Sequence, residues 1–320
     1  MGSRRRRAAW APLVTLLTVL GVVSGTQTGV PWASSPAQVV RAGESGELIP
    51  RSQVVRRALR ADTGQEYLLY VPGQGGHGVR LFVTVHGISR NVEEHATLFA
   101  PYAERHGVVL VAPCFTQDEH DDYQRLGRKG RGRRADLVLD AIVEEVGALT
   151  GARSRKIYLF GFSGGAQFAH RYVMAHPDRV ERAVLGAAGW YTFPDSGVGY
   201  PYGLGSSEEF AGVRFDPDSF LRVPITVLVG EADTGSESLR RNAQVDRQQG
   251  ATRLERARNW AAAMWRAAQA RGLEPLVTFE QVPGIRHSFK QFMQEGGLGD
   301  KVFGSLFGQE DPVWTTGGGR

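Results

Sequence analysis

The sequence has very little cysteine: Cys114 is the only one among 320 residues. An internal disulfide needs two cysteines and a cysteine-rich metal site needs several, so both are excluded. Cys114 follows the apolar run 108–111, which predicts a small hydrophobic side chain near the end of a strand rather than a reactive thiol.

The sequence also lacks a strong excess of charge of either sign. Its formal net charge is +5, but Arg4, Arg5, Arg6 and Arg7 supply four of these charges, so the rest of the chain carries +1. A nearly neutral body offers no broad basic surface for a phosphate backbone, and no nucleic-acid partner is predicted.

A long hydrophobic run is missing as well. Residues 8–23 are uncharged and mostly apolar, but a membrane span needs about 20 apolar residues. A short apolar run behind four arginines is typical of a secretory signal peptide, and paired arginines also permit twin-arginine export. We predict a signal peptide or, alternatively, an N-terminal anchor at 1–25. A linker at 26–50 and a catalytic domain at 51–320 follow. The body is expected to be exported to the periplasm or the medium, with no stable membrane span after processing.

Short apolar runs alternate with amphipathic segments along the rest of the chain. With 42% hydrophobic residues, the sequence can bury a sizeable core. Strands are predicted at 79–85, 108–111, 157–160, 184–185, 225–229 and 276–282, and helices at 92–105, 135–149, 164–176 and 254–271. An earlier strand pair, 53–59 and 67–71, flanks a turn at 62–64. The predicted fold is α/β, a mainly parallel sheet with helices on both faces and an antiparallel N-terminal edge hairpin.

One strand–helix junction carries the sequence Gly161-Phe162-Ser163-Gly164-Gly165. A G-x-S-x-G pentapeptide arises by chance in glycine-rich chains, so its position between a strand and a helix gives it meaning. That junction holds the serine side chain exposed on a sharp turn, beside the free N–H groups of the helix. We therefore interpret Ser163 as a candidate nucleophile.

A serine nucleophile needs a base and an orienting acid. His287 lies just after the last predicted strand, at the sheet edge where catalytic groups of α/β proteins gather. Asp233 follows the strand 225–229, with Glu231 as the alternative acid. The chain order Ser163, Asp233, His287 is that of the α/β hydrolases. The other histidines are expected on the surface, in loops or beside a strand end: His77, His86, His95, His106, His120, His170 and His176.

Several motifs together resemble the α/β-hydrolase superfamily, and the resemblance covers nearly everything after the linker. They are VRLFVTVHG (79–87), GFSGG (161–165), HPDRV (176–180), VGEAD (229–233) and PGIRHSF (283–289). The chain is most similar to exported esterases of the polyhydroxybutyrate-depolymerase and feruloyl-esterase type, in which an Asn, here Asn91, follows the His-Gly strand end. The resemblance implies a Ser163–His287–Asp233 triad and an oxyanion hole formed by the N–H groups of Ile88 and Gly164.

The predicted function is hydrolysis of carboxylic esters through an acyl-enzyme on Ser163, without a metal or an organic cofactor. The substrate is a small or oligomeric ester, and the oligomeric state stays open. The depolymerases of this group carry extra binding modules or disulfides, and this sequence shows neither, so polymer attack is in doubt. Two alternatives remain: amide or thioester hydrolysis on the same triad, and a non-catalytic binding module on a hydrolase fold.

Two segments interrupt the β/α pattern. Residues 189–222 are rich in aromatic side chains and prolines, and two interpretations stand. They form a lid-like excursion whose Trp190 and Tyr191 line the substrate pocket, or a cluster that only covers the sheet edge. Residues 116–134 hold acids first and bases second, which predicts a solvated, partly self-paired loop.

Overall fold

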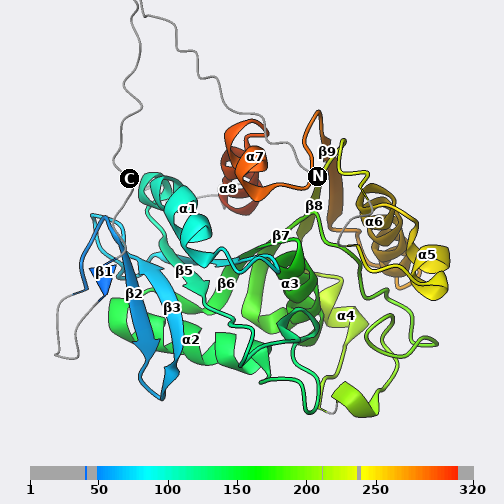
Figure 1. Ribbon diagram of the computed structural model, residues 1–320, viewed down its shortest axis with the longest axis horizontal. Coiled ribbons are helices and arrows are strands. Elements are labelled where there is room, and N and C mark those ends of the chain that lie inside the picture. Colours follow the sequence, from blue (N-terminus) through cyan, green and yellow to red (C-terminus); the bar gives the residue numbers. More distant parts are fainter. Residues whose placement is uncertain (1–39, 42–48, 211, 236–238, 309–320) are drawn as a thin grey trace, which may run out of the picture. The chain divides into compact units, whose positions relative to one another are not determined.

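The computed structural model describes residues 40–41, 49–210, 212–235 and 239–308 (Figure 1). The predicted signal segment and most of the predicted linker lie outside these residues. The short strand β1 (Val40–Arg41) falls within the stretch predicted as a linker, where it pairs in parallel with β2.

The described strands form one nine-stranded sheet in the order β1-β2-β3-β5-β4-β6-β7-β8-β9. The strands after β1 are β2 (Val54–Leu59), β3 (Asp62–Tyr70), β4 (Arg80–Val85), β5 (Val109–Pro113), β6 (Arg153–Phe162), β7 (Val180–Gly186), β8 (Ile225–Gly230) and β9 (Val277–Val282). All pairs from β5 to β9 are parallel, whereas β3 runs antiparallel to both β2 and β5. The predicted antiparallel hairpin near the N-terminal edge is therefore confirmed.

Helices cover both faces of the sheet. They are α1 (Val92–His106), α2 (Ala135–Thr150), α3 (Gly164–Ala175), α4 (Pro217–Phe220), α5 (Ala243–Gln249), α6 (Arg253–Gln269), α7 (Phe289–Gln294) and α8 (Leu298–Phe307). Apolar side chains of α1, α7 and α8 form one core with the sheet, and those of α2, α3 and α6 form the other. The sequence patterns predicted α1, α2, α3 and α6 but missed the shorter α4, α5, α7 and α8.

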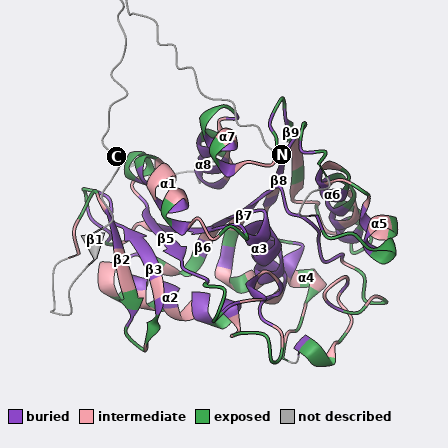
Figure 2. Cartoon of the chain, viewed as in Figure 1, coloured by how far each residue is buried: buried purple, intermediate pink, exposed green. Residues whose placement is uncertain are grey.

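The two cores explain why the central strands are continuous apolar runs. Strands β4, β5 and β8 are buried along nearly their whole length, because helices exclude water from both faces (Figure 2). Strand β9 ends the sheet and keeps several partly exposed residues. This arrangement confirms the predicted α/β-hydrolase fold. No helix in the described ranges is long and apolar enough to cross a membrane.

The charged loop 116–134 is not simply solvated, and that prediction was wrong in part. Tyr123 and Leu126 are fully buried in the core on the α2 and α3 side. Asp122 is buried too and forms ion pairs with Arg125 at 3.0 Å and Arg128 at 3.3 Å. The self-pairing was predicted correctly. One pair, Arg131 with Asp121, lies at the surface, whereas the pairs of Asp122 lie inside the protein and offset the cost of burying its charge.

Candidate active site

Ser163 lies on a strained turn between β6 and α3. Its backbone φ is +54° and ψ is −112°, a conformation that non-glycine residues rarely adopt. A Cβ on Gly161 would lie 2.1 Å from the Gly165 carbonyl oxygen, and one on Gly165 would lie 2.0 Å from the Val85 oxygen. Gly161 is therefore needed for β6 to pass this close to the start of α3, and Gly165 for α3 to pass this close to β4, as the G-x-S-x-G pattern predicted.

The structure brings Ser163, His287 and Asp233 into one hydrogen-bonded chain. His287 Nε2 lies 3.0 Å from Ser163 Oγ, and His287 Nδ1 lies 2.7 Å from Asp233 Oδ2. The Asp233 carboxylate is buried, whereas the alternative acid Glu231 is exposed. Donation from Nδ1 to the carboxylate leaves Nε2 as an acceptor for the serine hydroxyl.

These three residues meet because each follows a parallel strand. Ser163 follows β6, Asp233 follows β8 and His287 follows β9, and these strands all end at one edge of the sheet. Ligand and catalytic groups of open α/β sheets collect at the carboxyl edge. The ring of Phe162 stacks on His287 with centroids 5.3 Å apart, which also holds the imidazole in place.

Two backbone N–H groups lie beside Ser163. A Cβ on Gly164 would lie 3.2 Å from the Ile88 nitrogen, so the two predicted oxyanion-hole residues are neighbours. Gly87 lies against Ser163, because its own Cβ would meet the serine Cβ at 3.4 Å. Neither the Ile88 nor the Gly164 N–H donates to another residue in the described part of the chain.

The loop that carries Ile88 rests on buried side chains from residues 116–134. The Tyr123 hydroxyl donates to the His86 carbonyl oxygen at 2.9 Å, and a Cβ on Gly164 would lie 2.7 Å from that hydroxyl. His86 Nε2 accepts a hydrogen bond from the Phe115 N–H at 3.2 Å. Burial lowers the pKa of His86 to about 4, so its ring stays neutral at pH 7 and positions the backbone, as its place at a strand end predicted.

A hollow of about 320 Å³ opens above Ser163 and mixes apolar with polar groups. Besides Ser163 and His287, its lining includes Ile88, Asn91, Glu94, Phe162, Gln167, Arg253, Phe289 and Lys290. The Ile88 side chain is 54% exposed there. The sequence patterns did not indicate Arg253, since its only local signal is the Thr252 and Glu255 pair that marks a helix start.

Trp190 and Tyr191 do not line this hollow, so their prediction as pocket residues is corrected. They are 3% and 0% exposed. The Tyr191 ring stacks on Trp260 of α6 with centroids 4.9 Å apart, and the Arg171 guanidinium lies 4.2 Å from the Trp190 ring centroid. Aromatic side chains directly after β7 are drawn into the space between α3 and α6, where they bury more apolar area than at the open edge.

Several other histidines are buried, contrary to the surface and loop positions predicted for them. His95 and His170 are 0% exposed, and His120 is 1% exposed. Burial lowers the pKa of His120 to about 4 and those of His95 and His170 well below the usual value. His170 Nε2 accepts from the Thr192 N–H at 2.9 Å, which ties the segment 189–222 to α3. His77 and His106 are exposed, as predicted.

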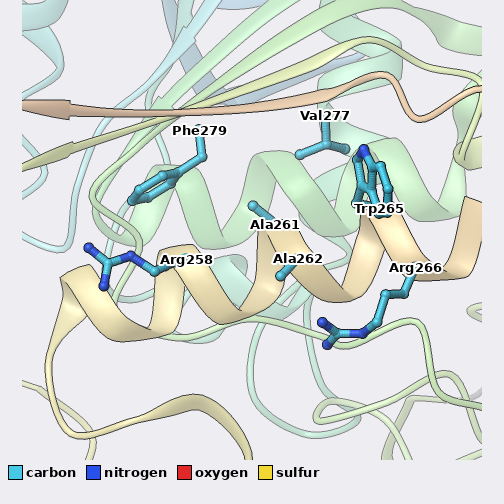
Figure 3. A pocket seen from close by; sticks show the side chains of 7 residues that line it. All are labelled: Arg258, Ala261, Ala262, Trp265, Arg266, Val277 and Phe279. Carbon is cyan, nitrogen blue, oxygen red and sulfur yellow. The ribbon is translucent and has the colours of Figure 1, made fainter.

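A larger groove, of about 620 Å³, lies between α6 and β9 and shares no lining residue with the hollow at Ser163. At one end of it Val277 of β9 lies beside Trp265 of α6 (Figure 3). At the other end Phe279 of β9 lies near Arg258, whose guanidinium is 5.9 Å from the ring centroid. The groove holds no nucleophile or base. Within the described residues, no group of three or more His, Cys, Asp and Glu side chains could hold a metal ion.

No protein-family model matches this sequence, and no curated protein matches it. Solved structures, in contrast, are similar. Poly(aspartic acid) hydrolase-1 from Sphingomonas sp. KT-1 is 25% identical over 75% of this chain and 93% of its own length, with a TM-score of 0.65. A poly(3-hydroxybutyrate) depolymerase from Bordetella parapertussis is 26% identical over 78% of this chain and 88% of its own, with a TM-score of 0.64. An S-formylglutathione hydrolase from Agrobacterium tumefaciens, 17% identical over 79% and 95% with a TM-score of 0.53, shares the fold.

Proposed function

We propose that this chain, a hydrolase of the α/β-hydrolase superfamily, cleaves carboxylic esters with Ser163 as nucleophile, His287 as general base and Asp233 as orienting acid. The observation that carries the proposal is the hydrogen-bonded chain from Asp233 through His287 to Ser163 on a strained turn. A serine in this setting has a base at hydrogen-bond distance and, although only 9% exposed, lines the hollow from which a substrate would approach.

In the first step, Ser163 Oγ forms a bond to the ester carbonyl carbon while its proton passes to His287 Nε2. The carbonyl π electrons move to oxygen, and the resulting oxyanion accepts hydrogen bonds from the Ile88 and Gly164 N–H groups. Each such donor contributes about 3 kcal/mol to the transition state. The oxyanion then collapses, the bond to the alkoxy oxygen breaks, and His287 donates its proton to the departing alcohol.

In the second step, His287 takes a proton from water as the water oxygen attacks the acyl-enzyme. The tetrahedral intermediate uses the same two N–H donors. Its collapse breaks the bond to Ser163 Oγ, which regains its proton from His287, and the carboxylic acid leaves. Asp233 stays ionised throughout and keeps Nδ1 protonated.

Amide hydrolysis is a second candidate, because the structural neighbour that is 25% identical is named a poly(aspartic acid) hydrolase, and poly(aspartic acid) is a polyamide. The neighbour that is 26% identical is named a depolymerase of a polyester. Both names favour an oligomeric acyl substrate. The hollow of about 320 Å³ accommodates one acyl unit of such a chain, with Ile88 and Phe289 as its apolar contacts.

The proposal is tested with a fluorophosphonate probe and matched chromogenic substrates. Wild-type protein should become labelled on Ser163 and hydrolyse p-nitrophenyl esters faster than the corresponding p-nitroanilides. Ser163→Ala should keep the fold, lose the label and lower kcat by about 10⁶-fold. Hydrolysis by Ser163→Ala within tenfold of wild type would exclude this mechanism, and an unlabelled, inactive wild type would indicate a binding module instead.

We also propose that the protein is exported. The support is the run of four arginines followed by the uncharged, mostly apolar residues 8–23. N-terminal sequencing of protein from the native host should find a start beyond Val23. Soluble cytoplasmic protein that begins at Met1 or Gly2 would contradict export.

A further inference from the structure

We propose that Arg253 is a positioning residue for the reaction: it holds one oxygen of the Asp233 carboxylate so that the other faces His287. The inference rests on the proposed function, since it assigns Arg253 a part in the same triad. Asp233 Oδ1 lies 3.1 Å from Arg253 Nη1, and Asp233 Oδ2 lies 2.7 Å from His287 Nδ1. The two carboxylate oxygens thus have different partners.

Both members of this ion pair are buried, with side chains 3% exposed for Arg253 and 1% exposed for Asp233. Little water reaches the carboxylate, so its orientation and charge depend on protein groups. Arginine suits this task because its guanidinium stays charged and offers several N–H donors in one plane. A second donation, from Arg253 Nη1 to the Gly235 carbonyl oxygen at 3.4 Å, ties the same side chain to the turn after β8.

The backbone of Arg253 is itself firmly placed, because it is the first residue of α6. Thr252 and Glu255 form a reciprocal capping box around it: Thr252 Oγ1 accepts from the Glu255 N–H, and Glu255 Oε2 accepts from the Thr252 N–H. Three residues on, the fully buried Arg256 donates to the Gly189 carbonyl oxygen at 2.7 Å. Gly189 lines the hollow, so the first turn of α6 supports both the acid and one wall of the site.

The electrostatic consequence is specific. Without the guanidinium, the buried carboxylate loses its partner at Oδ1 and is free to rotate away from the geometry that keeps His287 Nδ1 protonated. Nε2 then faces Ser163 in the wrong tautomer for part of the time, which lowers kcat without weakening ground-state binding. A misplacement of this kind costs up to about 100-fold.

The experiment compares Arg253→Gln and Arg253→Lys with Arg258→Gln in the full chain. Arg258 is the matched control, because it lies on the same helix but is exposed at the groove between α6 and β9 (Figure 3). Arg253→Gln should lower kcat for a neutral p-nitrophenyl ester by about 10- to 100-fold with little change in KM. Arg253→Lys keeps the charge and should recover part of the loss. Arg258→Gln should behave as wild type.

A proton NMR measurement separates positioning from general loss of structure. The proton shared by His287 Nδ1 and Asp233 Oδ2, which lie 2.7 Å apart, should resonate far downfield in wild-type protein. It should shift or broaden in Arg253→Gln but not in Arg258→Gln. If Arg253→Gln does not fold, Arg253→Lys carries the test, with a smaller loss of kcat and a smaller shift of the same resonance. Unchanged kcat and an unchanged downfield proton in Arg253→Lys would then overturn the proposal.

Two further outcomes distinguish what has failed. If Arg253→Gln raises KM only for esters with an acidic acyl group and leaves kcat unchanged, Arg253 binds substrate and the positioning role is wrong. If wild-type protein is neither labelled by fluorophosphonate nor active, the proposed function fails before Arg253 is tested. An active wild type with a fully active Arg253→Gln variant refutes only the role of Arg253.

Discussion

The Ser163 turn and the segment 189–222 make an instructive contrast, because both attracted a functional interpretation from the sequence. The turn occupies the predicted place, with Ser163 at the carboxyl edge of the sheet and His287 at 3.0 Å. The aromatic residues that begin the second segment were predicted to line the same hollow, but Trp190 and Tyr191 lie in the core.

The difference lies in the kind of signal. The G-x-S-x-G pattern reflects a steric requirement that only glycine satisfies, since a Cβ on Gly161 or Gly165 would lie about 2 Å from a backbone oxygen. Aromatic composition reflects only a tendency of side chains to be buried, and it does not indicate which part of the molecule they pack against. A pattern set by backbone geometry therefore predicted where its residues lie better than a pattern set by hydrophobicity did.

The largest expected effect tests whether Asp233 is the acid that orients His287. Asp233→Asn should lower kcat by about 10⁴-fold, because an amide at this position favours the wrong His287 tautomer. Glu231→Gln should have little effect, since Glu231 is exposed and the hydrogen bond of His287 Nδ1 goes to Asp233. Steady-state kinetics with one p-nitrophenyl ester compare the two. If Glu231→Gln lowers kcat more than Asp233→Asn does, Glu231 and not Asp233 is the orienting acid.

The contrast itself is tested by pairing Trp190→Ala with Ile88→Ala. Trp190→Ala removes a buried ring that packs on the Arg171 guanidinium, and the free energy of unfolding should fall by about 3–5 kcal/mol. Its preference among acyl lengths should stay that of wild type. Ile88→Ala removes an exposed side chain from the hollow and should change acyl preference with little loss of stability. Denaturant unfolding measures the free energy of unfolding, and a series of esters measures the acyl preference. If Trp190→Ala changes the acyl preference and leaves the stability intact, Trp190 does line the substrate pocket.

The buried histidines His86 and His120 should make the free energy of unfolding depend on pH in the acid range. The pKa values of His86 and His120 are about 4, below the usual 6.5, so the folded state binds these protons less readily than the unfolded state. Each histidine therefore leaves the free energy of unfolding undiminished above about pH 6.5 and lowers it as the pH falls toward 4. At pH 4 each has lowered the free energy of unfolding by about 3 kcal/mol. His120→Leu should reduce the stability difference between pH 7 and pH 4 by roughly that amount. An unchanged pH dependence of unfolding would show that His120 is not protonated on unfolding in this range.

The smallest expected effect concerns Tyr123. Tyr123→Phe removes the hydroxyl that donates to the His86 carbonyl oxygen and so loosens the loop that carries the Ile88 N–H. Removal of a whole oxyanion donor lowers kcat by about 10²-fold or more. We expect Tyr123→Phe to lower kcat by less than that, with KM nearly unchanged. Tyr102→Phe, on a partly exposed tyrosine of α1, is the control. Equal kcat values for the two variants would show that the hydroxyl does not support the oxyanion loop.

The sequence alone was enough to predict most strands, the four longest helices, and the positions of Ser163, Asp233 and His287 just after the strands β6, β8 and β9. These features depend on local physics: apolar periodicity for the central strands, glycine geometry for the turn, and residues that directly follow strand ends. The six-residue α7 escaped prediction because it is too short to show a helical period and is stabilised mainly by packing against α1 and the sheet. The helix α8 was missed for no such reason, since its apolar residues Leu298, Val302 and Leu306 recur at helical spacing.

Which polar residues are buried, and what they contact, could be seen only in the folded structure. Asp122, His95 and His120 have the sequence character of surface residues, yet they lie inside the protein. Arg253 is 20 positions beyond Asp233 and reaches it only because α6 begins beside the end of β8. Contacts between distant segments depend on how helices settle on the sheet. That depends on the summed packing of many side chains, so no short stretch of sequence encodes it.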